Sequence, residues 1–130
     1  MNPAEKIESE LSAGLDGLGE QIVRHFLSVW DHAPAIEPLP ALLRSAPTDE
    51  HSAAMFTEYI ERKIITRIAA AVPEPARLRA ELVGSHLMGM ALARYVLRIE
   101  PLASTPADNV ANWMGPTLQR YLADPAPEQA

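Results

Sequence analysis

The stretch VGSHLMGMALARYVLRIEPLAS, from Val83 to Ser104, decides the fold of this chain. No charged residue lies between Glu81 and Arg94, and two glycines, Gly84 and Gly89, interrupt an otherwise helical pattern. A glycine inside a helix costs about 1 kcal/mol relative to alanine. We therefore expect a helix that packs against protein on more than one side, where close contacts offset the cost of its glycines.

On a helical wheel this segment has two apolar sides. One side carries Leu82, Ser85, Gly89, Leu92, Ala93 and Val96, and the other carries Val83, His86, Met90 and Leu97. A chain of 130 residues holds little protein to cover both sides of one helix. The pattern therefore predicts that one side faces the core and that the other faces a second copy of the chain in a homodimer.

Prolines and glycines divide the rest of the chain into helical segments. The expected helices span residues 3–13, 16–32, 39–45, 48–72, 74–99 and 106–123, with Asn2, Asp16 and Thr48 as N-caps. The sequence shows no internal repeat, and no alternating run is long enough for a strand. We therefore expect an all-α fold in a single domain over residues 1–130, with 124–130 as a frayed tail.

Composition excludes several classes of function. The absence of cysteine rules out disulfides and thiolate metal sites. A net charge of −6 argues against a nucleic-acid surface, which needs clustered Lys and Arg. The uncharged run 82–93 is far shorter than the roughly 20 residues of a membrane span, and the first residues carry charges where a signal peptide would be apolar. We expect a cytoplasmic protein with no membrane contact.

The last helix offers a second apolar surface suited to dimerisation. Two such terminal helices from each of two chains would form a four-helix interface, in which small residues allow the backbones to approach closely. The residues expected at this interface are Ser85, Gly89, Ala93, Val96, Trp113, Met114, Leu118 and Tyr121.

Four segments together carry a family resemblance. They are GLDGLGEQIVRHFLSVWD (14–31), LRSAPTDE (43–50), RAELVGSHLMGMALARYVLRIEPLAS (79–104) and MGPTLQRYL (114–122). In this order and at this spacing they resemble the C-terminal domain of one branch of the tetracycline-repressor-like (TetR-family) transcriptional regulators of high-GC bacteria. The resemblance covers the chain from Leu15 to Leu122, and 83–104 is its most specific part.

The resemblance implies a regulatory role. Such a domain is an all-helical bundle, forms a homodimer through its last two long helices and holds a pocket for a small, often hydrophobic effector. The DNA-binding unit of these regulators is an N-terminal helix-turn-helix unit, and we find no recognition helix ahead of Leu15. We therefore expect no direct DNA contact from this chain; operator DNA would be bound by a full-length parent, as a repressor.

Apolar and aromatic side chains on three helices are candidates for the effector pocket. They are Phe26, Trp30, Met55, Phe56, Tyr59 and Met88. Such residues line ligand pockets, but they also fill cores, and the resemblance is what favours a pocket. A stand-alone helical dimerisation or interaction module with no ligand therefore remains open as the alternative.

Catalysis and metal binding have little support in the sequence. His25 and His32 share a helix face, but the chain has no His-Glu-x-x-His pattern to complete a zinc site. Ser28, Asp31 and His32 show no oriented triad, and no glycine-rich phosphate loop is present. We therefore expect no enzyme activity, no metal and no cofactor, and we expect His86 to be a hydrogen-bonded histidine of the core or interface.

Overall fold

The computed structural model describes residues 15–32, 41 and 44–128. Every regular element in this part of the chain is helical, which confirms the all-α prediction. The helix expected over 3–13 and most of the one expected over 39–45 lie outside the described residues. Residues 124–128 follow the last helix as an exposed segment without helical structure.

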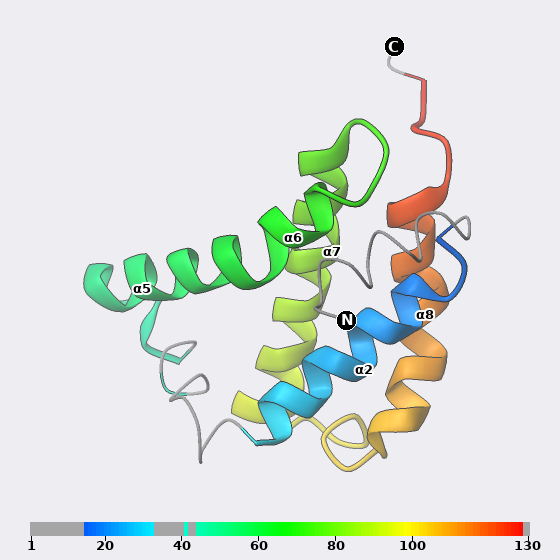
Figure 1. The fold of residues 1–130 in the computed structure, drawn as a ribbon. Coiled ribbons are helices and arrows are strands. Elements are labelled where there is room, and N and C mark those ends of the chain that lie inside the picture. Colours follow the sequence, from blue (N-terminus) through cyan, green and yellow to red (C-terminus); the bar gives the residue numbers. More distant parts are fainter. Residues whose placement is uncertain (1–14, 33–40, 42–43, 129–130) are drawn as a thin grey trace.

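The elements form a bundle in which helix α7 is central (Figure 1). They are α2 (Leu18–Asp31), α5 (Glu50–Ile60), the π-helical segment η1 (Glu61–Ile65), α6 (Thr66–Ala69), α7 (Ala76–Ala91), the π-helical segment η2 (Leu92–Val96) and α8 (Ala107–Ala123). Segments α5, η1 and α6 follow one another as a long arm, and α7 returns beside α6 and η1. Helix α8 packs on α7 and, more extensively, on α2.

The two longest predicted helices are each interrupted by a π-helical turn. The segment expected over 48–72 is α5, η1 and α6, and the segment expected over 74–99 is α7 and η2. After η2, Arg98 adopts a positive φ of 53°, which ends the helix before the predicted Ile99. The Arg94 side chain then donates hydrogen bonds to the carbonyls of Leu102 and Thr105, at 2.8 and 2.6 Å, and so ties the following loop to η2.

The core lies where α2, α7 and α8 meet. Its largest fully buried side chains are Trp30, Leu27, Leu87, Leu118, Leu122, Val23 and Val83. Burial of a leucine or valine side chain stabilises the fold by about 1.5–3 kcal/mol relative to its exposed state. None of the helices in the described residues is long and apolar enough to span a membrane.

Two predicted N-caps are wrong. Helix α5 is capped by Asp49, whose Oδ1 accepts a hydrogen bond from the His51 amide at 3.1 Å; Thr48 instead donates to the Ser45 carbonyl at 3.3 Å. Helix α2 begins after Gly17, at φ 75°, and has no side-chain cap from Asp16. The turn that precedes it needs a positive φ, which glycine adopts at little cost.

A distant side chain takes the place of the missing cap on α2. The Gln119 Oε1 accepts a hydrogen bond from the Gly19 amide at 2.7 Å, and its Nε2 donates to the Leu15 carbonyl at 2.6 Å. The first amides of a helix have no partner within the helix itself. Helix α8 therefore caps α2 through a tertiary contact.

Two glycines allow α2 and α8 to cross at close range. A Cβ atom on Gly19 would lie 2.4 Å from the Gly115 carbonyl oxygen and 2.7 Å from the Gln119 amide nitrogen. A Cβ atom on Gly115 would lie 2.9 Å from the Cα of Glu20. These neighbours are backbone atoms, which cannot rotate away as a side chain can. The crossing therefore requires glycine on both helices.

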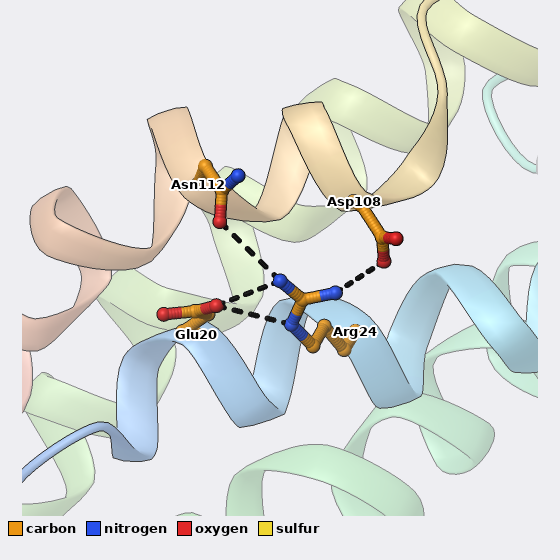
Figure 2. A network of polar contacts seen from close by, with 4 residues as sticks. All are labelled: Glu20, Arg24, Asp108 and Asn112. Atoms are coloured by element: carbon orange, nitrogen blue, oxygen red, sulfur yellow. Dashed lines mark hydrogen bonds and ion pairs between the residues drawn. The ribbon is translucent and has the colours of Figure 1, made fainter.

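A polar network closes the exposed edge of the same crossing (Figure 2). The Arg24 guanidinium donates two hydrogen bonds to Glu20 Oε1, at 3.1 and 2.8 Å, on its own helix. It also donates to Asp108 and, at 3.3 Å, to Asn112 Oδ1 on α8. Backbone packing and this charged network together hold α2 and α8 as one unit.

Candidate functional site

Three aromatic side chains meet between the end of α2 and η2. Trp30, which is 1% exposed, lies 5.6 Å from Phe26 and stacks on Tyr95 with ring centroids 5.5 Å apart and an interplanar angle of 23°. The guanidinium carbon of Arg94 lies 5.5 Å from the centroid of the Tyr95 ring, within the range of a cation–π contact. The sequence singled out Phe26 and Trp30, and the structure brings them together with Tyr95.

Tyr95 also fixes the position of this cluster. Its hydroxyl donates a 2.7 Å hydrogen bond to Asp31 Oδ1, which joins η2 to the last residue of α2. Burial raises the pKa of the Tyr95 hydroxyl above its ordinary value, and the hydrogen bond to Asp31 acts in the same direction. Tyr95 therefore stays protonated and serves as a donor at neutral pH.

Two polar atoms of the cluster have no hydrogen-bond partner among the described residues, the indole Nε1 of Trp30 and the Nε of Arg94. Both atoms are buried. A buried donor left without an acceptor costs about 1–3 kcal/mol. An acceptor atom from a water or from a bound molecule would remove that cost.

The pocket candidates on α5 and α7 differ in how deeply they are buried. Phe56 is 3% exposed, and its ring lies 6.3 Å from that of the partly buried Tyr59. Met88 on α7 is partly buried against the same core. Met55, by contrast, is 45% exposed. It lies on the outer side of α5, and we therefore leave it out of the pocket proposed below.

The outer side of α7 forms an open groove with α8. Its volume is about 500 Å³, and it is lined by Ser85, His86, Gly89, Met90, Ala93, Leu102 and Met114. A Cβ atom on Gly89 would meet no atom of the described residues within 4 Å. Four residues expected at the dimer contact, Ser85, Gly89, Ala93 and Met114, thus share one uncovered apolar surface.

The other four expected contact residues take different positions. Trp113 on α8 is 84% exposed, whereas Val96 and Tyr121 are partly buried. The Tyr121 ring lies 5.8 Å from that of His86 in the groove wall. Leu118 is fully buried in the core of its own chain, so it has no surface to offer to a partner and is left out of the contact surface proposed below.

The side chains weighed for catalysis do not form a catalytic set. His32 Nδ1 lies 2.7 Å from the backbone oxygen of Ser28, which gives the ring a carbonyl partner on its own helix. His25 is exposed on α2. Within the described ranges, no three His, Asp or Glu side chains gather in a way that could hold a metal ion.

Comparison with known proteins places this bundle in a family. The model of the tetracyclin repressor-like C-terminal domain matches residues 16–122. The chain belongs to this family. A crystal structure of a TetR-family regulator from Streptomyces coelicolor A3 is similar, at 35% identity and a TM-score of 0.65 over 93% of this chain and 84% of that chain. No curated protein matches the sequence.

Membership confirms the resemblance that the four sequence segments carry. The chain is a C-terminal domain of the TetR type, a class of transcriptional regulators and not of enzymes. In this chain the buried aromatic cluster and the open groove are separate features. The first lies inside the bundle, and the second lies on the outer side of α7 and α8.

Proposed function

We propose that this domain senses a small hydrophobic effector and dimerises, and that the two together control operator binding by a full-length regulator. Family membership supports the regulatory role. The observation that carries effector binding is the buried, unpartnered indole N–H of Trp30 within an aromatic cluster. Its proposed lining is Phe26, Trp30 and Tyr95, with Phe56, Tyr59 and Met88 beside them.

The cluster limits the chemistry of the effector. Aromatic and aliphatic side chains favour a largely apolar molecule, and the Trp30 indole N–H favours one that carries a well-placed acceptor atom. An effector with a carbonyl or ether oxygen fits both conditions. The Tyr95 hydroxyl donates to Asp31, so its proton is already engaged, and the free donors of the cluster are the Trp30 indole N–H and the Arg94 Nε–H.

A matched pair of probes tests this function. We expect 9-fluorenone to bind more tightly than fluorene, which has the same ring system without the carbonyl, by roughly three- to tenfold. In Trp30→Phe a smaller aromatic ring replaces the indole and the N–H is lost, so the preference should disappear. Calorimetry gives both affinities, and thermal unfolding checks that the variant is folded.

Other outcomes would argue against the pocket. A preference for 9-fluorenone that survives in Trp30→Phe would place the binding site elsewhere. If neither probe, nor any member of a panel of apolar carbonyl compounds, raised the melting temperature, the stand-alone dimerisation module would be favoured. A ligand at 100 times its Kd stabilises the fold by about 2.7 kcal/mol, so such binding is readily seen.

The dimerisation module without a ligand is the second candidate. The observation in its favour is the groove of about 500 Å³, which lies on the outer side of α7. Under either function we propose that the last two long helices join two chains in a four-helix contact. The surface available for it includes Ser85, Gly89, Ala93, Val96, Trp113, Met114 and Tyr121.

DNA binding belongs, in this proposal, to the parent regulator in the cytoplasm. This chain carries a net charge of −6, which repels phosphate. A gel shift with operator-containing duplex should show no specific band for this chain at physiological salt. A band that survives excess non-specific competitor would overturn this part of the proposal.

A further inference from the structure

The most exposed large hydrophobic side chain of the described residues, that of Trp113, lies beside the open groove of α7 and α8. Trp113 is 84% exposed, far more than a tryptophan usually is in a folded domain. Its neighbour Met114 forms part of the groove wall. Successive residues of a helix differ in direction by about 100°, so Trp113 projects outward from the rim of the groove instead of filling it.

We propose that Trp113 of each chain inserts into the α7–α8 groove of a second copy. This proposal rests on the dimer proposed above and specifies how that dimer is held together. In a two-fold dimer the same surface supplies both halves of each contact, here an exposed indole and an apolar groove. Two identical insertions form, one on each side of the two-fold axis.

The groove has the size and openness that an indole ring needs. Its volume of about 500 Å³ lies within the range of about 300–1,000 Å³ that holds drug-sized molecules. Gly89 adds no side chain, and the space where its Cβ would lie is empty. The methionines Met90 and Met114 in the wall are flexible and adapt their shape to an aromatic ring.

Charge favours a second copy of this chain over a charged partner. No Asp, Glu, Lys or Arg lies in the segment 82–93, which supplies most of the groove wall. Two chains that each carry a net charge of −6 repel at long range, and this repulsion is weakest where they approach over an uncharged surface. Trp113 and the groove provide such a surface, and tryptophan is enriched among residues that dominate interface energy.

Four proteins test the insertion by a double-mutant cycle: wild type, Gly89→Leu, Trp113→Ala and the double variant. Gly89→Leu places a side chain in the groove, and we expect it to leave the fold of the single chain unchanged, because a Cβ at that position meets no atom of the described residues within 4 Å. We expect each single change to weaken dimerisation by more than tenfold in sedimentation velocity. If Trp113 occupies the groove, the double variant should be about as weak as Trp113→Ala alone.

Acrylamide quenching gives a second measurement, which is made on the wild-type dimer. In the single chain Trp30 is buried, whereas Trp113 is accessible. If Trp113 inserts, its fluorescence should become protected from acrylamide at concentrations where the chain is dimeric. Quenching of Trp113 should return on dilution, when the dimer dissociates. Met55→Ala, which removes an exposed side chain on α5, is the control and should change neither measurement.

The outcomes separate this inference from the dimer on which it rests. A dimer in which Trp113 remains quenchable overturns the insertion and leaves the proposed dimer in place. If the losses of dimer affinity in the two single variants multiply in the double variant, the insertion is likewise overturned and the proposed dimer stays in place. A wild type that is monomeric at every concentration overturns both proposals.

Discussion

Helix α8 meets its surroundings in two contrasting ways. Toward α2 it is closed: Gly19 and Gly115 bring the two backbones into contact, and Gln119 caps the neighbouring helix. Toward the outer side of α7 it is open, and in the groove beside Met114 no atom of the described residues lies within 4 Å of a Cβ built on Gly89. One helix thus has one side packed against its own chain and another side that is uncovered.

The contrast shows that a helical glycine does not identify its partner. Gly115 and Gly89 both cost helix stability, but one is required by a backbone in its own chain and the other faces open space. An unfilled glycine site in an uncharged helix is useful only if something approaches it. The two sides of α8 should therefore respond in opposite ways to the same substitution.

The largest effect is expected at the α2–α8 crossing. Gly19→Ala should lower the free energy of unfolding by about 3 kcal/mol, because its Cβ would overlap backbone atoms of Gly115 and Gln119. Chemical denaturation measures the change. Gly84→Ala is the matched control, since its Cβ would lie 3.7 Å from Ile65, an ordinary contact. Equal effects of the two changes would contradict the close crossing.

Loss of the tertiary cap comes next. Gln119→Leu keeps the approximate size of the side chain but leaves the Gly19 amide without its acceptor, at a cost of about 1–3 kcal/mol. The Leu15 carbonyl loses one of its two donors and keeps the Leu18 amide. Hydrogen exchange should show that the first turn of α2 loses protection before the rest of the helix. An unchanged exchange rate at Gly19 would mean that water replaces the glutamine without loss.

A substitution on the open side should raise the stability of the chain instead of lowering it. Gly89→Ala should raise the stability of the single chain, measured at high dilution, by up to about 1 kcal/mol, because alanine favours helix and nothing obstructs its Cβ. A destabilised monomer would show that the groove is filled within the chain and would remove the contrast between the two sides.

The smallest effect is expected from the charged edge of the crossing. Arg24→Gln breaks the contacts with Glu20, Asp108 and Asn112, but these groups lie where solvent and salt screen them. We expect a slight fall in the melting temperature at low salt, which vanishes in high salt. A large fall that persists in high salt would place this network, and not the glycines, at the centre of the crossing.

The sequence predicted the helices better than their contacts. Periodicity and the uncharged run 82–93 identified α7, and the resemblance led to the correct family. The crossing of α2 and α8 was missed, because Gly19 and Gln119 are 100 positions apart and no local pattern pairs them. The cap at Asp16 was wrong for the same reason, since the amide of Gly19 is satisfied from a distant helix.

The candidate site was predicted in part. Phe26 and Trp30 were chosen by their spacing on one helix face, and they do lie together. Tyr95 was missed as their partner, although an aromatic residue in an apolar helix is a signal that could have marked it. Met55 follows the same helical period as the buried residues, but the arm α5 is covered on one side only. Which side is covered depends on the tertiary arrangement.

The molar mass of the wild-type chain under stepwise dilution tests most directly the claim that the open side of α7 and α8 receives a second copy. Sedimentation equilibrium should give twice 14.2 kDa at high concentration and fall toward 14.2 kDa as the chain is diluted. Gly89→Leu should make this transition at a higher concentration while its helical content stays unchanged. A wild-type mass of 14.2 kDa at every concentration would contradict the account.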